Sequence, residues 1–355
     1  MRFPFIDLSK AFAAQLIVLH HLAFYGPMSD EARILSPALI DWLAEHGRLA
    51  VQVFLVIGGY LAARSLASQA STPIGRPWTL IWQRYCRLAM PFAVALGLAV
   101  LSAAIARALL PLETTPAAPG PLQLIAHLLL LQNLLGLEVL SAGAWYVAID
   151  LQLYALLVAL VWLSQRLATR RQREVAVALT AALGLVSLFH FNRNAAWDDW
   201  GLYFFAAYAM GAVAFWISED RRRTIWLAFM AVAVFAALLL DFRSRIGVAF
   251  GIGVLLAVVG RSGRLSRRLD NRWVALGGKV SYSIFLAHYP VCLLVNAAFG
   301  RYAPHSPHWH LAGLSLAWGL SIGAGILFHR FVEVPVGVWL SSSNTRRLAA
   351  TASTA

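Results

Sequence analysis

The chain has 355 residues, of which 60% are hydrophobic and only 13% charged, and its mean hydropathy is +0.69. Soluble domains are nearer half apolar and a quarter charged, so this composition excludes an ordinary soluble protein and favours the bilayer as the solvent. The formal charge of +13 does not indicate a nucleic-acid partner, because the arginines stand in short clusters between apolar stretches, as in cytoplasmic loops. Two cysteines, Cys86 and Cys292, are too few for a disulfide framework.

Ten apolar stretches of roughly 20 residues predict transmembrane helices. They cover residues 6–25, 48–67, 88–110, 145–164, 175–191, 200–217, 224–241, 245–260, 279–299 and 311–330. The first is interpreted as a retained span, because it lacks the small-residue cleavage site of a signal peptide. The sequence therefore predicts an all-α, polytopic membrane helical bundle of about ten helices. We expect a single transmembrane domain over 1–340 and a short polar cytoplasmic tail over 341–355.

A further apolar stretch, 122–141, follows a proline-rich loop and is interpreted as a helix that lies in or dips into the outer face. The distribution of charge supports this interpretation. With a cytoplasmic N-terminus and ten spans, most of the 29 Lys and Arg residues fall on the cytoplasmic side, whereas the outer loops are relatively acidic. An eleventh span would place dense arginine clusters outside. Both termini are therefore expected in the cytoplasm.

The first span carries several ionisable residues, which are costly inside a membrane and indicate function by default. Lys10 and His21 are eleven positions apart, so they lie on one helix face, separated by roughly 16 Å along the axis. Asp7 falls on the same stripe, and His20 lies about 80° away. The alternative is that Lys10 snorkels to the inner headgroups and that His21 makes a polar contact between helices.

Arg84 and Arg87, just before the third span, are three residues apart and share a helix face. At the cytoplasmic surface such a pair suits phosphate groups, because arginine forms bidentate hydrogen bonds to them. The alternative is an ordinary positively charged membrane anchor.

Four more polar positions lie within or at the end of later spans. Asp150 is roughly 7–8 Å inside the outer end of its span, a depth similar to that of His21, and a carboxylate there needs a partner. His288 falls near mid-membrane, two residues before Pro290, which would bend the helix and free a carbonyl group. Arg330 and Glu333 close the last span and could simply pair with each other. No metal site is predicted, because the spaced histidines His305, His308 and His310 are expected in a solvated outer loop.

Taken together, these segments resemble the membrane acyltransferase-3 family. The resemblance rests on six motifs in the family's order, from residue 5 to residue 335. They are Phe5 to Lys10 with His21, Val53 to Leu61, Arg84-x-x-Arg87-Leu88, the run containing Trp145, Tyr146, Asp150, Gln152 and Tyr154, the run from Ser281 through His288 to Pro290, and Arg330 to Pro335 with Glu333. The chain departs from the family in having Lys10 where Arg is commoner, Gly58 where Ser is usual, and Asp150-Leu151 where many members have two glutamates.

The resemblance implies an integral membrane O-acyltransferase that uses acyl-CoA, usually acetyl-CoA, as its donor substrate and has no permanently bound cofactor. We expect Lys10, Arg84 and Arg87 to hold the phosphates of CoA. His21 is expected to act as general base, or to form an acyl-imidazole, with Asp150 orienting its ring. The acceptor is expected to be a hydroxyl group of an envelope carbohydrate or glycolipid. The high ratio of Arg to Lys suggests bacteria, and therefore the bacterial cytoplasmic (inner) membrane.

A proton-coupled transporter or flippase remains the main alternative, because intramembrane His, Asp and Arg also serve proton coupling and kinked helices are common in transporters. No pairing of two repeated halves is visible in the sequence. A membrane scaffold would leave the stripe of Lys10 and His21, and Asp150, without a role.

Overall fold

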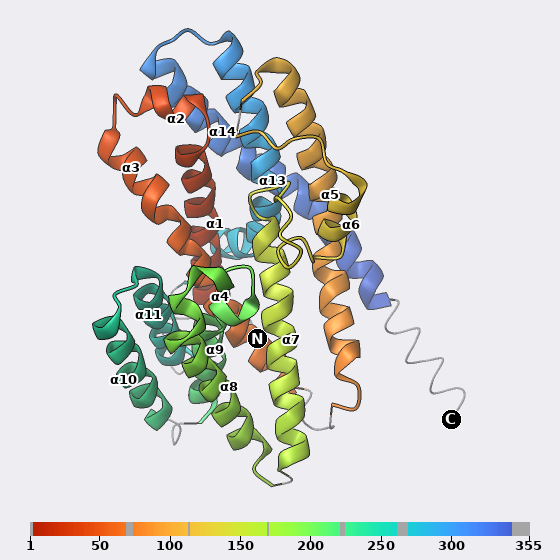
Figure 1. Ribbon diagram of the computed structural model, residues 1–355, viewed down its shortest axis with the longest axis vertical. Coiled ribbons are helices and arrows are strands. Elements are labelled where there is room, and N and C mark those ends of the chain that lie inside the picture. The colour runs from red at the N-terminus through yellow and green to blue at the C-terminus, as the bar shows by residue number, and fades with distance from the viewer. Residues whose placement is uncertain are drawn as a thin grey trace. The chain divides into compact units, whose positions relative to one another are not determined.

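The computed structural model describes residues 3–68, 74–112, 114–168, 170–220, 224–260 and 269–342. Within these ranges every regular element is a helix (Figure 1). The long helices are α1 (Pro4–Phe24), α4 (Ala50–Ser68), α5 (Pro77–Leu109), α7 (Ala144–Leu167), α8 (Gln172–Phe189), α9 (Gly201–Glu219), α10 (Thr224–Leu240), α11 (Ser244–Val259), α13 (Arg272–Tyr302) and α14 (Pro307–Phe328). The short helices are α2 (Pro27–Ala32), α3 (Pro37–His46) and α6 (Pro121–Leu128).

Seven helices of the described residues are long and apolar enough to cross a membrane. They cover Pro37–Ala67, Pro77–Leu109, Ala144–Leu167, Gln172–Arg193, Gly201–Glu219, Arg272–Tyr302 and Pro307–Ser342. Each of the ten predicted spans coincides with a helix, but α1 is not among these seven, and α10 and α11 are shorter apolar helices. The polytopic all-α class is confirmed, whereas the count of ten spans and the cytoplasmic position of both termini stay predictions.

The chain divides into two compact units, each assembled from three separate stretches. Unit 1 contains Met1–Ala13, Leu49–Trp82 and Ala148–Lys279, and unit 2 contains Ala14–Arg48, Gln83–Val147 and Val280–Ala355. The division runs through α1, α5, α7 and α13, so neither unit is a consecutive piece of chain. The single domain expected over 1–340 stays a prediction.

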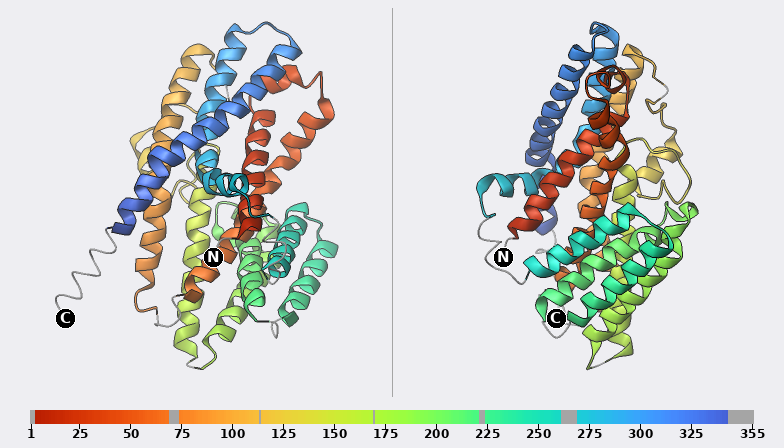
Figure 2. Two further views of the ribbon diagram at one scale, coloured as in Figure 1. Left: turned by 180° about the vertical axis from the view of Figure 1, so that it is seen from behind. Right: turned by 90° about the vertical axis from the view of Figure 1, so that its left-hand side faces the viewer.

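Helix α9 forms the centre of unit 1. It is apolar on all sides and almost wholly buried, as expected of a helix surrounded by other helices rather than by lipid. Its Gly211 lies against the backbone of α4, and Gly59 of α4 lies against the backbone of α9. Close approach of two backbones through small residues is the usual way in which membrane helices associate. Helices α8, α10 and α11 lie side by side with α9 (Figures 1 and 2).

In unit 2, α5 packs against α13 through a row of alanines. Ala99, Ala103 and Ala106 contact Tyr289, Leu293 and Ala297 in one buried cluster. Helix α1 ends at Phe24, and Gly26 directly before α2 has a φ of 90°, a conformation that favours glycine. There the side-chain amide of Asn296 donates to the carbonyl oxygen of Tyr25 at 3.2 Å, which attaches the end of α1 to α13.

The stretch 122–141 differs from the predicted helix. Helix α6 ends at Leu128, and turns follow, with Leu130 and Gly136 at positive φ. The fully buried His127 donates from Nδ1 to the carbonyl oxygen of Gln123 at 2.7 Å, and its Nε2 accepts from the backbone N–H of Leu140 at 3.1 Å. The prediction of a helix to residue 141 is wrong because backbone bonds within turns, together with the side chain of His127, satisfy this backbone instead of a continued helix. Eight helical residues are too few to cross a bilayer.

The last helix continues through a π-helical turn, His329–Glu333, as far as Ser342. The first two residues of the predicted tail are therefore helical, and the rest of 341–355 lies outside the described residues. At the other end of α14, His310 is 2% exposed instead of lying in a solvated loop, because the helix begins at Pro307. Of the other two histidines, His305 is exposed and lies 3.5 Å from a carboxylate oxygen of Glu31.

Candidate active site

Two histidines of unit 2 form a buried pair. Nδ1 of His21, near the end of α1, lies 2.7 Å from Nε2 of His288 in the middle of α13. The ring centroids are 4.9 Å apart and the ring planes are within 13° of parallel. His21 is 9% exposed and His288 is 0% exposed. The structure thus joins the catalytic candidate of the first span to a polar residue 267 positions later in the chain.

The hydrogen bonds of His288 fix the tautomers of both rings. Nδ1 of His288 lies 2.8 Å from the carbonyl oxygen of Phe285 and 3.2 Å from that of Ile284. A carbonyl oxygen only accepts, so this nitrogen carries the proton, and Nε2 of the neutral ring is an acceptor. Nδ1 of His21 must therefore donate to it. In the neutral His21 ring, Nε2 is then the nitrogen with the free lone pair, and it can take a proton.

Aromatic side chains surround the pair. Tyr25 stacks on His21 with centroids 5.6 Å apart, and Phe285 lies 6.2 Å from His288. Phe285 in turn makes an edge contact with Tyr146 at 5.2 Å, and Tyr146 makes one with Trp145 at 6.1 Å. The start of the α7 motif therefore contributes to the lining around the histidines. Such surroundings limit water and hold the rings in place.

The paired arginines belong to the same unit. Arg84 is half-buried and Arg87 is exposed, both in the first half of α5. The next residue, Leu88, accepts a hydrogen bond through its carbonyl oxygen from the hydroxyl of Tyr282 on α13 at 3.3 Å. Six helical residues, or roughly 9 Å of rise, separate Tyr282 from His288 along α13. The arginines are therefore separated from the histidine pair along α5 and α13, and their role in binding donor phosphates stays a prediction.

The other candidates of the first and fourth motifs lie in unit 1. Asp7 and Lys10 are half-buried on α1. Asp150 is 3% exposed, and its carboxylate packs near Gly58, where a Cβ atom would lie 3.5 Å from Oδ1. Asp150 thus lies in a close-packed interior beside Gly58, the position at which serine is usual in the family. Its predicted role of orienting His21 stays a prediction, and the contact at Nδ1 of His21 is made by His288.

Two further residues of the α7 motif, Gln152 and Tyr154, follow Asp150 along the helix. Oε1 of Gln152 accepts from the backbone N–H of Gly201 at 2.7 Å. This bond attaches α7 to the start of α9, so it positions an element rather than a reacting group. Tyr154 is 8% exposed and belongs to the core of unit 1.

At the closing motifs, Glu333 pairs with His329 and not with Arg330. Nδ1 of His329 lies 2.9 Å from Oε2 of Glu333, and the hydroxyl of Ser283 donates to the same oxygen at 2.5 Å. The guanidinium of Arg330 instead lies 5.5 Å from the ring centroid of Phe331. Ser281 is 2% exposed on α13. The sequence did not single out Ser283 and His329, although His329 stands directly beside Arg330.

Among the described residues no group of three His, Cys, Asp or Glu side chains could hold a metal ion. The described residues thus combine a buried histidine pair, a separate arginine pair and helices long and apolar enough to cross a membrane. The family model described as an acyltransferase domain matches residues 3–335, so the chain belongs to the acyltransferase-3 family.

One curated relative is a Caenorhabditis elegans protein named Regulator of hypoxia-inducible factor 1. It is 23% identical over 409 aligned positions, which cover 96% of this chain and 81% of the relative. No solved structure matches the chain.

Proposed function

We propose that this protein transfers an acyl group, most simply acetyl, from cytoplasmic acyl-CoA to a hydroxyl group of an envelope carbohydrate or glycolipid at the outer face. Membership of the acyltransferase-3 family supports the acyl-transfer class. The observation that carries the mechanism is the His21–His288 pair, because its hydrogen bonds leave Nε2 of a buried histidine as a base. Transfer to a hydroxyl needs such a base, since the neutral hydroxyl is a weak nucleophile.

In the proposed reaction, Nε2 of His21 takes the proton of the acceptor hydroxyl while the oxygen attacks the carbonyl carbon of the thioester. The new C–O bond forms and the C–S bond breaks, with the electron pair of that bond remaining on sulfur. The imidazolium then returns the proton to the thiolate, so the products are the O-acyl acceptor and free CoA. Through its Nε2, His288 accepts from Nδ1–H of His21 throughout, which stabilises the imidazolium and keeps the ring orientation.

Arg84 and Arg87 are proposed to bind the phosphates of the donor. Arginine pairs hold phosphate oxygens with bidentate hydrogen bonds. The phosphates do not react, so this binding is expected to act on donor affinity more than on the chemical step. We further propose that Lys10 also binds donor phosphates and that Asp150 helps to orient the ring of His21. The bacterial inner membrane is the proposed location.

The experiment compares labelled acetyl-CoA turnover by the purified protein in nanodiscs for wild type, His21→Ala and His20→Ala. His20, the residue directly before His21 on α1, is the matched control. Its Nδ1 lies 3.0 Å from the carbonyl oxygen of Leu43. Slow CoA release by wild type and His20→Ala, lowered at least about a hundredfold in His21→Ala, is the expected result. Normal turnover by folded His21→Ala contradicts the mechanism. Labelled acetate retained on His21 after denaturation would identify the acyl-imidazole route instead.

The transporter alternative is tested in proteoliposomes. An acyltransferase releases CoA from labelled acetyl-CoA in stoichiometric proportion to the acceptor it modifies. A transporter moves a polar or lipid-linked substrate across the bilayer without releasing CoA. Uptake without any CoA release by folded wild-type protein would overturn the proposed function.

A further inference from the structure

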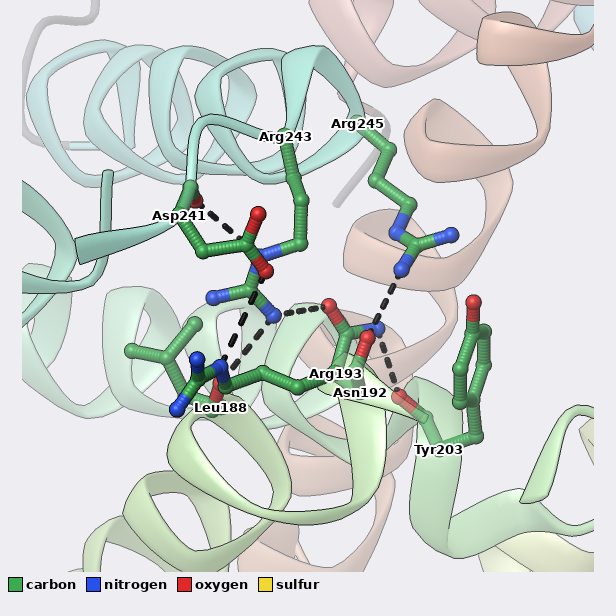
Figure 3. A network of polar contacts seen from close by, with 7 residues as sticks. All are labelled: Leu188, Asn192, Arg193, Tyr203, Asp241, Arg243 and Arg245. Carbon is green, nitrogen blue, oxygen red and sulfur yellow. Dashed lines mark hydrogen bonds and ion pairs between the residues drawn. The ribbon is translucent and has the colours of Figure 1, made fainter. Parts of the chain in front are cut away.

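A second polar network lies in unit 1, where the loop between α8 and α9 meets the loop between α10 and α11 (Figure 3). Its central residue is Asn192, which is 3% exposed. The amide of Asn192 donates to the carbonyl oxygen of Tyr203 at 2.9 Å, and its Oδ1 accepts from Nη1 of Arg243 at 2.6 Å. Its backbone carbonyl oxygen accepts from Nη2 of Arg245 at 2.7 Å. One buried residue therefore holds two arginines, Arg243 through its side chain and Arg245 through its backbone carbonyl oxygen.

Three guanidinium groups gather at this point. The Nε atoms of Arg243 and Arg193 lie 3.3 Å and 3.8 Å from the same carboxylate oxygen of Asp241. The guanidinium of Arg245 lies 4.8 Å from the ring centroid of Tyr203. Two arginines thus share one carboxylate, and the third lies over an aromatic ring. Burial, followed by the nearby Arg245 and Arg193, lowers the pKa of Arg243, while Asp241 opposes that change.

Asp198 in the α8–α9 loop also acts on this charge balance. Burial and the adjacent Asp199 raise the pKa of Asp198, and Arg245 opposes the rise. The side chain is exposed, so water screens its interaction with Arg245. Asp241 is therefore the carboxylate that forms the close ion pairs of the network.

Two donors of the network have no hydrogen-bond acceptor among the described residues. They are Nη2 of Arg243 and Nε of Arg245, both shielded from solvent. Arg243 as a residue is 9% exposed, whereas the side chain of Arg193 is 49% exposed. A buried charged donor without an acceptor is costly, so native proteins usually satisfy it with protein groups, water or a ligand. The network therefore combines fixed, unsatisfied arginine donors with an arginine that solvent reaches.

The position of the network agrees with an outer-side site. It lies at the end of α8 and the start of α9, and between α10 and α11. The dense basic clusters of the sequence, at Arg166 to Arg173 and Arg261 to Arg272, adjoin the opposite ends of α8 and α11. The positive-inside rule assigns those clusters to the cytoplasm, and hence the network to the outer side. The N-terminus of α11, directly after Arg243, adds a partial positive charge there.

We propose that Arg193, Arg243 and Arg245 bind a phosphate or carboxylate group of the acyl acceptor, so that the acceptor is an anionic carbohydrate or glycolipid. The inference rests on the proposed function, which requires an acceptor at the outer side. Arginine is the residue best suited to this task, because its planar donors match the geometry of both anions. Asn192 and Tyr203 hold the arginines in place, and Asp241 forms ion pairs with both Arg193 and Arg243.

The test measures binding of glucose 1-phosphate and of uncharged glucose to the purified full-length protein. The protein is held in nanodiscs of zwitterionic phosphatidylcholine, without acyl-CoA. Saturable binding of the phosphate, and none of glucose, is expected. Arg193→Gln and Arg245→Gln should each weaken phosphate binding by about tenfold or more, because a charged hydrogen bond is lost. The exposed Arg301→Gln, on α13 in unit 2, is the matched control and should bind like wild type.

Several outcomes would overturn the inference. Glucose binding as tightly as glucose 1-phosphate, or equal phosphate affinity in wild type and both variants, shows that these arginines hold no anion. If Arg245→Gln is unstable, Arg193→Gln decides, because its side chain is half exposed. A second arm uses nanodiscs that contain phosphatidylglycerol. Retention of that lipid by wild type and its loss in both variants, with no binding of the soluble phosphate, would assign the site to a lipid headgroup and overturn the acceptor role.

These results are independent of catalysis. Because no acyl-CoA is present, a protein that fails to turn over acetyl-CoA can still bind the sugar phosphate. A failure of the acceptor site is therefore distinguishable from a failure of the proposed acyl transfer.

Discussion

The close contact between α4 and α9 gives a prediction that depends on backbone geometry alone. A Cβ atom at Gly59 would lie 1.9 Å from the carbonyl oxygen of Tyr208, and one at Gly211 would lie 1.8 Å from that of Val56. Both obstacles are backbone atoms, so no side chain can rotate away. To restore ordinary contact the helices would have to separate by roughly 1.5 Å, which removes dispersion contacts along the whole interface.

Gly59→Ala and Gly211→Ala are therefore expected to destabilise the protein by about 2 kcal/mol or more each, the upper range for overpacked cores. The intrinsic helix propensity acts in the opposite direction, because alanine is favoured over glycine by about 1 kcal/mol inside a helix. Sequence propensity alone thus predicts the wrong sign. Gly251 on α11 provides the matched control, because a Cβ atom there meets nothing within 4 Å.

The assay is thermal unfolding of the purified variants in one detergent, followed by intrinsic fluorescence. Gly59→Ala and Gly211→Ala should lower the melting temperature by at least about 3 °C, whereas Gly251→Ala should leave it unchanged or raise it. Melting temperatures at or above wild type for both interface variants would refute the close backbone approach of α4 and α9.

Three further predictions concern the polar residues. Arg84→Ala combined with Arg87→Ala should raise the KM for acetyl-CoA by roughly tenfold or more with little change in kcat, as expected of groups that bind a non-reacting part of the donor; an unchanged KM would contradict their role. His20→Ala should lower the melting temperature, because the contact to the carbonyl oxygen of Leu43 is lost, yet retain acetyl-CoA turnover. Asn192→Ala should destabilise the protein by about 1–3 kcal/mol, because the buried guanidinium of Arg243 loses one of its two acceptors at Nη1 and keeps only the carbonyl oxygen of Leu188; a wild-type unfolding midpoint in detergent would argue against the buried network.

The helices were predictable because their signal is local. Each of the ten apolar runs predicted to span becomes a helix, since a chain in a bilayer must satisfy its backbone hydrogen bonds within the segment. Orientation depends on a different signal, the placement of arginines, and stays a prediction. The stretch after Leu128 could not be predicted, because turns, together with side-chain bonds of His127 to Leu140 and of Gln132 to Ala144, take the place of helical bonds. Apolar composition alone does not distinguish these two ways of satisfying a buried backbone.

The candidate site was predicted only in part. The sequence pointed to His21 and to His288 separately, because each histidine stands inside an apolar run, where ionisable groups are rare and costly. Their pairing depends on the packing of α1 against α13, which is a tertiary property. The same holds for Glu333, which bonds to Ser283 on another helix. Asn192 and Arg243 lie in short connections between helices and Arg245 lies in the first turn of α11. At all three positions the sequence showed ordinary polar residues and gave no sign of a buried network.

The central claim is that His21 is the base and that His288 orients it, and a double-mutant cycle on acetyl-CoA turnover in nanodiscs tests this most directly. The account predicts that His288→Ala lowers kcat by roughly a hundredfold with an unchanged KM for acetyl-CoA, since general-base catalysis contributes about 10²–10⁴-fold. It also predicts that the double variant His21→Ala/His288→Ala is no slower than His21→Ala alone, because His288 acts through His21. Full turnover by His288→Ala would contradict the account. So would a double variant that is slower than His21→Ala by the same factor by which His288→Ala is slower than wild type.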